Sequence, residues 1–355
     1  MRYAALSRRR LLRLAVLAAG AMALGGCRES ERAPGTAPGP AGAAPPVEGP
    51  RKLRFGFSGV FDITKLPYPI ALARLRAQGY EFETVFLDSA VVTFKALIAG
   101  ELDLGEGAVG AAIQANQAAG GGDRLRVFCS MNPLTDYVIV TAPDITSLEG
   151  LVGRRIGVAR LGSISHFVPR VVLQRSGIDP DAVEWIAVGG TTARRAALYS
   201  GAIVGGAMHI EEALLTQRDG FNIIFEAAKV MPEYIANGLV AKDSFIRAYP
   251  GVIQQITNAM IDAARWVQDN REEAIAFAQR ELGSEADLTL LGMAYDTMAR
   301  IRGWGVNGGL TPENMTATML EELEMKTIEQ PMPWEEWATL EFVNRYLAER
   351  GLYRS

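Results

Sequence analysis

The stretch GSISH (residues 162–166) places a serine and a histidine three residues apart. Residues at this spacing share one face of a helix, so Ser163 and His166 could supply the nucleophile and base of a hydrolase. That chemistry also needs an acid that orients the histidine, and the sequence offers no evident one. A serine at a helix start is also a common N-cap. The pattern favours ligand contact over catalysis, and we predict no catalytic residue.

Short polar turns of this kind recur after other strand-like segments. Their glycines let a ligand approach the backbone, and their hydroxyls and free N–H groups at helix starts can bind an anion or a carbonyl. The predicted ligand-binding residues are Ser58, Phe61, Ser89, Glu106, Gly107, Ala108, Tyr137, Ser163, Ser165, His166, Thr191, Thr192 and His209, with Val109 ending the third turn. Five such turns predict a cleft between two lobes.

Each candidate also has a purely structural interpretation. Serines and threonines before helices commonly serve as N-caps. Tyr137 could simply pack within the crossover between the lobes, and His166 could lie on a solvent-exposed helix face. His209 could be a core histidine whose ring nitrogens are hydrogen-bonded within the protein. Arg194 and Arg195 are adjacent, so at most one can face a cleft, and both suit an exposed surface.

Aromatic residues among the candidates indicate a class of ligand. Phe61, Tyr137 and the two histidines favour an organic ligand that stacks and accepts hydrogen bonds over bare nitrate. An aromatic or heterocyclic compound fits this description, and so does a sulfonate or carboxylate with an apolar tail.

The segments that would position these residues alternate between strand and helix. Strands are expected at 52–59, 82–89, 102–108 and 124–131, with helices between them. A second set with the same rhythm runs from 136 to 227, followed by a last strand at 234–245 and long amphipathic helices. The pattern predicts an α/β fold with largely parallel sheets, which bind ligands at the carboxyl ends of their strands.

The first residues resemble an export signal. Five arginines (Arg2, Arg8, Arg9, Arg10 and Arg13) accompany an apolar run, 11–24, that is too short to span a bilayer of ~30 Å. Its end, LGGC, resembles the lipobox of bacterial lipoproteins, which implies a lipid on Cys27. SRRRLLR (7–13) is similar to the twin-arginine motif, and general secretion is the alternative route. We expect a signal peptide at 1–26 and a disordered tether, rich in Pro, Gly and Ala, at 27–51.

Composition excludes several function classes. Loss of the five leader arginines changes the formal charge from −4 to −9, which disfavours nucleic-acid binding. With Cys27 lipidated, Cys129 is the only free thiol that remains, so an intramolecular disulfide and a multi-cysteine metal site are excluded, and we expect Cys129 buried in a strand. With two histidines in the chain, a histidine-rich zinc site is excluded as well, and no cofactor is expected.

Several segments together resemble one protein family. FLDSAVVTFKALIAGELDLG (86–105), SLEGLVGRRIGV (147–158), the turn at 162–166, the helix at 191–201 and YIANGLVAK (234–242) resemble, in order and spacing, the ABC-transporter substrate-binding proteins of the nitrate/sulfonate/taurine type, a group that includes thiamine-precursor binders. The resemblance covers roughly residues 52–280.

The resemblance implies a two-lobe, type II periplasmic-binding fold. Lobe 1 would comprise 52–137 and 241–355, and lobe 2 would comprise 138–240, with two crossover strands between them. The lobes would close on a small solute by hinge motion. The resemblance further implies a monomer outside the cytoplasm, in the periplasm or at the cell surface, anchored by lipid and delivering its solute to an ABC permease. An enzyme or a sensory lipoprotein on the same fold is the alternative.

Overall fold

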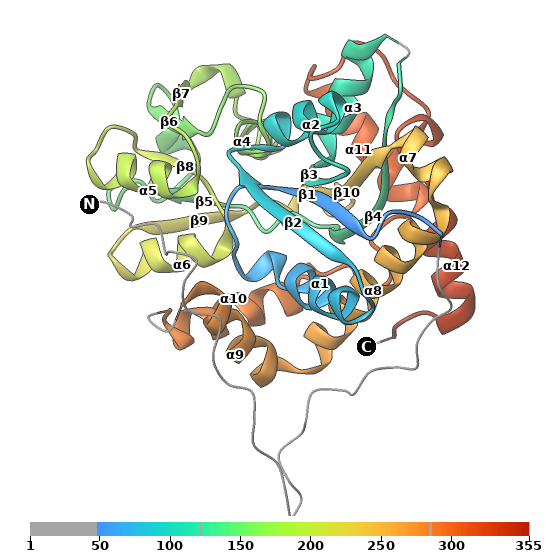
Figure 1. The fold of residues 1–355 in the computed structure, drawn as a ribbon. Coiled ribbons are helices and arrows are strands. Elements are labelled where there is room, and N and C mark those ends of the chain that lie inside the picture. Colours follow the sequence, from blue (N-terminus) through green and yellow to red (C-terminus); the bar gives the residue numbers. More distant parts are fainter. Residues whose placement is uncertain (1–47, 121, 284–285, 355) are drawn as a thin grey trace, which may run out of the picture. The chain divides into compact units, whose positions relative to one another are not determined.

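The computed structural model describes residues 48–120, 122–283 and 286–354. The predicted signal peptide, the predicted lipidation site Cys27 and most of the predicted tether lie outside these residues. Within them the chain forms two five-stranded sheets with helices packed on their faces (Figure 1). The predicted α/β class is confirmed. None of the helices in the described ranges combines the length and the apolarity needed to cross a membrane.

The first sheet has the strand order β2-β1-β3-β10-β4. Its strands are β1 (Lys52–Ser58), β2 (Glu81–Leu87), β3 (Leu104–Ala108), β4 (Leu125–Asn132) and β10 (Asn237–Lys242). β1 pairs in parallel with β2 and β3, whereas β10 runs antiparallel between β3 and β4. Cys129 lies in β4 and is buried, as the sequence predicted.

Helices cover both faces of this sheet. α1 (Pro67–Ala77) packs against α8 (Pro250–Asp269) on one face, and α2 (Ala90–Ala99) and α3 (Val109–Ala119) lie on the other (Figure 1). α2 ends at Gly100, whose φ of 78° is a left-handed conformation that glycine adopts without strain. α2 and α3 each follow a parallel strand directly, so both begin at the carboxyl edge of the sheet.

The second sheet repeats this arrangement, with the order β7-β6-β8-β5-β9. Its strands are β5 (Val138–Thr141), β6 (Arg155–Val158), β7 (Glu184–Ala187), β8 (Gly205–Met208) and β9 (Asn222–Glu226). β6 is parallel to β7 and β8, and β5 is antiparallel to β8 and β9. In both sheets the antiparallel inner strand is formed by the segment that has just left the other sheet.

Three helices follow the parallel strands of the second sheet. They are α4 (Ile164–Arg175), α5 (Thr191–Tyr199) and α6 (Ile210–Arg218). The C-terminal region adds α7 (Asp243–Ala248), α9 (Arg271–Leu282), α10 (Leu288–Arg300), α11 (Pro312–Glu324) and α12 (Glu341–Arg350). Short 3₁₀ helices lie at Ile63–Lys65 (η1), Glu149–Leu151, Pro180–Ala182, Ala227–Lys229 and Trp334–Glu336. α10 packs against α6, so the C-terminal region also contacts the second sheet's helices.

Two connections, 133–137 and 227–236, join the sheets. We use lobe 1 for residues 48–132 and 237–354, and lobe 2 for residues 138–226. The expected limit between 240 and 241 falls inside β10, which pairs only with strands of the first sheet. We therefore place the return to lobe 1 before residue 237.

Candidate functional site

A cleft of about 570 Å³ is lined by residues of both lobes. Lobe 1 contributes the carboxyl ends of β1 and β2 and the starts of α2 and α3, while lobe 2 contributes the starts of α4, α5 and α6. These segments meet there because each helix follows a parallel strand and so begins at the same edge of its sheet. Most of the predicted ligand-binding residues line this cleft, namely Ser58, Phe61, Ser89, Ala108, Tyr137, Ser163, Ser165, Thr191, Thr192 and His209.

Four predicted residues, Glu106, Gly107, Val109 and His166, are not among the residues that line the cleft. Gly107 is required by packing, because a Cβ there would come within 2.6 Å of the Ala90 Cβ of α2. Glu106 is fully buried behind Ser58, whose backbone N–H (3.2 Å) and hydroxyl (3.4 Å) donate to its Oε2.

His166 turns away from the predicted role. Its Nδ1 accepts a hydrogen bond from the Gly162 N–H at 3.0 Å, and its ring meets Trp185 edge-on with centroids 5.0 Å apart. Burial and the nearby Arg170 lower the pKa of His166 to about 4, so the ring is neutral at pH 7. His166 therefore stabilises the turn before α4 instead of facing a ligand.

The hydroxyl of Ser163 is likewise committed to local structure. It donates to the Arg160 carbonyl at 2.7 Å and lies 3.0 Å from the Ser165 hydroxyl, which accepts from the Ala159 N–H at 2.8 Å. Because the hydroxyl of Ser163 and the ring of His166 bond to different groups, this arrangement is not a nucleophile–base pair.

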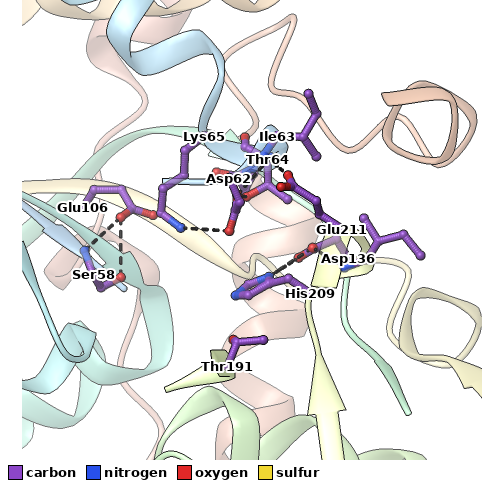
Figure 2. A network of polar contacts seen from close by, with 12 residues as sticks. Ser58, Asp62, Ile63, Thr64, Lys65, Glu106, Asp136, Thr191, His209 and Glu211 are labelled. Atoms are coloured by element: carbon purple, nitrogen blue, oxygen red, sulfur yellow. Dashed lines mark hydrogen bonds and ion pairs between the residues drawn. The ribbon is translucent and has the colours of Figure 1, made fainter. Parts of the chain in front are cut away.

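A network of buried charges lies at the lobe 1 side of the cleft (Figure 2). Asp62 caps η1, accepting from the Thr64 N–H at 3.0 Å and the Thr64 hydroxyl at 2.5 Å. The Lys65 ammonium lies 3.7 Å from Asp62 Oδ2. Burial alone would raise the pKa of Asp62, but Lys65, His209 and Thr64 hold it below its ordinary value. Asp62 is therefore ionised at pH 7 despite its burial.

Glu106 and Lys65 also influence each other. Burial alone would lower the pKa of Lys65, but the charges of Asp62 and Glu106 raise it above its ordinary value. Burial raises the pKa of Glu106, and Lys65 and the Ser58 N–H offset part of that rise. One ammonium thus faces two buried carboxyl groups.

His209, at the N-cap of α6, pairs with Asp136 from the first connection between the lobes. Its Nδ1 lies 2.9 Å and 3.0 Å from the two carboxylate oxygens of Asp136. Burial alone would lower the pKa of His209, but Asp136 raises it above its ordinary value. The ring packs on Tyr137, with centroids 4.3 Å apart. Tyr137 and His209 together form an aromatic wall of the cleft.

Glu211, in the first turn of α6, links the two lobes directly. Its Oε2 accepts a hydrogen bond from the backbone N–H of Ile63 at 2.9 Å. Burial and repulsion from Asp62 raise the pKa of Glu211 to about 7, although the Ile63 N–H opposes the rise. The Asp62 carboxylate of lobe 1 thus lies close enough to disfavour the ionisation of Glu211 in lobe 2.

Arg194 is a buried cation on the lobe 2 side. Its guanidinium donates to the carbonyls of Ala207 and Gly189, each at 3.0 Å, and to the Thr191 hydroxyl at 2.9 Å. It therefore fixes the start of α5 to β8. Its neighbour Arg195 forms an ion pair with Glu212 at 3.0 Å. Of the two arginines, Arg194 is the one that lines the cleft.

Glu322 brings a carboxyl group to the cleft from α11, far along the chain. It accepts from the Tyr234 hydroxyl at 2.7 Å and the Gln114 amide at 3.3 Å, and also from Thr327. Burial raises the pKa of Glu322, and these hydrogen bonds offset part of the rise. In the described ranges no group of three His, Cys, Asp or Glu side chains is placed to hold a metal ion.

Seven charged residues that line the cleft were not among the predicted ligand-binding residues: Asp62, Lys65, Asp88, Arg194, Glu211, Glu212 and Glu322. A signal existed for Asp62, because an Asp two residues before a Thr in DIT is a typical cap of a short helical turn. For Glu211 and Glu322 the local sequence is that of an ordinary acidic helix, and the tertiary arrangement alone places them.

Solved structures share this fold. An alkanesulfonate-binding protein, SsuA from Xanthomonas axonopodis pv. citri, solved with bound MOPS, is 17% identical, with 82% of this chain and 99% of that chain covered and a TM-score of 0.69. The nitrate-binding protein NrtA from Synechocystis PCC 6803 is 11% identical, with 85% and 89% covered and a TM-score of 0.70. A protein of Bordetella bronchiseptica RB50 is 20% identical, with 84% and 98% covered and a TM-score of 0.71.

At such identities the likeness concerns the fold, and it confirms the predicted two-lobe periplasmic-binding architecture. A search of curated protein sequences found no match. The sequence model of one family, described as NMT1-like, matches residues 47–280, about two thirds of the chain. This agrees with the resemblance seen in the sequence over residues 52–280, and the chain therefore belongs to the NMT1-like family.

Proposed function

We propose that this protein is the extracytoplasmic solute-binding component of an ABC importer, and that it captures a small organic solute without altering it. The observation that carries this proposal is the cleft of about 570 Å³ whose walls come from both lobes. Because the lobes are joined by two connections, a hinge motion at 133–137 and 227–236 would open and close the cleft. A solute that contacts both walls stabilises the closed state, and this is how binding would drive closure.

The relatives support a transport role over catalysis. Two of the proteins that share the fold are named for binding alkanesulfonate and nitrate. In this chain Ser163 and His166, the pair that the sequence offered for nucleophilic catalysis, are engaged in the turn before α4. A carrier needs no reactive group, and polar and aromatic side chains on two walls suffice.

A lipid anchor is the part of this proposal that rests on the sequence. A lipid on Cys27 and a tether at 27–51 would keep the binding lobes near a membrane permease and raise their effective concentration there. Substitution Cys27→Ser should release the protein from the membrane fraction, and mass spectrometry of the wild-type N-terminal peptide should show the acyl groups. Equal membrane association of both proteins would contradict the anchor.

Native mass spectrometry of the freshly purified protein tests the solute-binding role. We expect a one-to-one complex with a small molecule that, once extracted, rebinds with unchanged mass. Thr192→Trp should lose the complex because the indole fills the cleft, whereas Thr316→Trp, on the exposed side of α11, should keep it. The proposal fails if no solute is retained, or if the extracted compound is chemically converted on rebinding.

A further inference from the structure

The cleft carries an excess of acidic side chains. Its lining residues include the acids Asp62, Asp88, Glu211, Glu212 and Glu322 but, as formal cations, only Lys65 and Arg194 among the described residues. Glu212 is paired with Arg195, and Asp88 lies 4.0 Å from Arg160, so these two have cations of their own. The acidic lining residues that remain are Asp62, Glu211 and Glu322.

Asp62 and Glu211 approach each other from opposite walls. Asp62 caps η1 in lobe 1, and Glu211 belongs to α6 in lobe 2, where it accepts a hydrogen bond from the N–H of Ile63, the residue next to Asp62. Two like charges brought together on closure repel each other, and the repulsion is strong where water is scarce. The two carboxyl groups therefore lie near each other, and the neighbouring groups that favour their charge are the Lys65 ammonium and the His209 ring.

A third carboxyl group has one oxygen without a hydrogen-bond partner. Glu106 is fully buried, and its Oε1 has no hydrogen-bond partner, whereas its Oε2 is bound by Ser58. Figure 2 shows this carboxyl group reaching from β3 toward Ser58 and Lys65, on the same side as Asp62. A buried acceptor without a donor is costly, and a cation bound beside Ser58 would lessen that cost, although Glu106 itself lies behind the cleft wall.

The neighbouring wall is aromatic. The rings of Tyr137 and His209 pack against each other at a tilt, and both residues line the cleft. A tyrosine face attracts a cationic or electron-poor planar group. Carboxylates bind amidinium and ammonium groups with short, charge-assisted hydrogen bonds, whereas a sulfonate at this end would add a further negative charge.

We propose that Asp62 and Glu211, with Glu106 buried behind them, recognise a positively charged nitrogen group, a protonated amine or an amidinium, on an organic ligand that stacks on Tyr137. The inference rests on the proposed solute-binding function and narrows its ligand. The cation supplies the counter-charge that closure of the two walls requires, and so its binding favours the closed state.

Three ring compounds of similar size but different charge test the inference: benzamidine, benzamide and benzenesulfonate. Calorimetric titration of the full purified protein at pH 8 should show saturable binding of benzamidine, with benzamide and benzenesulfonate at least about tenfold weaker. The neutral amide controls for stacking alone, because it keeps the ring and loses the charge.

Two variants connect the effect to the carboxyl groups. Glu211→Gln keeps an oxygen that can accept from the Ile63 N–H but removes the charge, and it should weaken benzamidine binding about tenfold while leaving benzamide unchanged. Asp62→Asn is a second, independent test in case Glu211→Gln folds poorly. Urea unfolding of each variant shows whether it is folded. Glu341→Gln, which removes an exposed charge paired with Arg345, should bind benzamidine like the wild type.

Three results would overturn the inference: benzenesulfonate binding more tightly than benzamidine, no binding of any probe, or benzamidine binding that is equal in the wild type and in both folded variants. Saturable binding of benzenesulfonate, or an anionic solute retained on purification, would contradict the proposed cation site but would agree with the proposed solute-binding function. Absence of any retained solute in the mass spectrum would instead remove the carrier role.

Discussion

The carboxylate of Glu322 lies against the α-carbon of Gly110, so that a Cβ at residue 110 would overlap it. Gly110 is the second residue of α3, and Glu322 comes from α11, more than two hundred residues later. Glycine in a helix costs about 1 kcal/mol relative to alanine. The structure tolerates this cost because the glycine leaves room for a buried carboxyl group at the cleft.

Gly110→Ala should therefore destabilise the protein, although alanine is the better helix former. Overpacking of this kind costs about 1–3 kcal/mol of unfolding free energy, measurable by urea denaturation. The cost should shrink when Glu322→Ala is introduced as well, since the clash then disappears. Gly122→Ala, where a Cβ meets open space, should stay within about 0.5 kcal/mol of wild type. Equal costs at positions 110 and 122 would contradict the packing described.

The raised pKa of Glu211 predicts a pH dependence of stability. A carboxyl group whose pKa rises from 4.5 in the unfolded chain to about 7 in the folded protein holds its proton more tightly when folded. Its contribution is therefore complete below pH 4.5 and is lost as the pH rises toward 7. The unfolding free energy of Glu211→Gln minus that of the wild type should increase between pH 4.5 and 8. A difference that stays constant over this range would show that Glu211 titrates normally.

The two adjacent arginines should differ strongly on substitution. Arg194→Ala removes three hydrogen bonds from a buried guanidinium, and we expect a loss of roughly 2–4 kcal/mol together with weaker solute binding. Arg195→Ala breaks a partly exposed ion pair with Glu212 and should cost less than about 1 kcal/mol. Urea unfolding of both variants measures the contrast, and similar losses would argue against the assigned role of Arg194.

Two histidines allow a direct test of the site's electrostatics by NMR titration. One imidazole, His166, should titrate at about pH 4, and the other, His209, above its ordinary value near 6.5. Asp136→Asn should lower the pKa of His209, because the paired carboxylate is removed, and should leave His166 unchanged. If both resonances moved in the variant, or neither did, the Asp136–His209 pairing would be wrong.

Much of the cleft rim could be predicted from sequence, because glycine- and hydroxyl-rich turns after strands mark the carboxyl edge of a parallel sheet. Ser58, Ser89, Ser163 and Thr191 were found in this way, and all four line the cleft. The rule identifies positions in the chain but does not fix side-chain direction. His166 follows the same pattern and turns back to Gly162.

The charged groups were harder to predict, because they depend on packing between segments distant in sequence. Glu211 owes its raised pKa to burial and to Asp62, which lies 149 positions earlier and in the other lobe. Glu322 belongs to α11, beyond the region of family resemblance, and an acidic helix gives no local sign that one glutamate is buried. At neither Glu211 nor Glu322 does the hydrophobic periodicity of the helix distinguish a buried glutamate from one on a solvent-exposed face.

The position of β10 has a consequence for the order in which the chain can fold during synthesis. All five strands of the second sheet lie within residues 138–226, so that sheet can be completed as soon as this stretch has left the ribosome. The first sheet cannot be completed early, because β10, which lies between β3 and β4 (Figure 1), is the last of its strands to be synthesised. A nascent chain that ends before residue 237 leaves β4 without its neighbour, with an unpaired strand edge exposed until translation has passed residue 242.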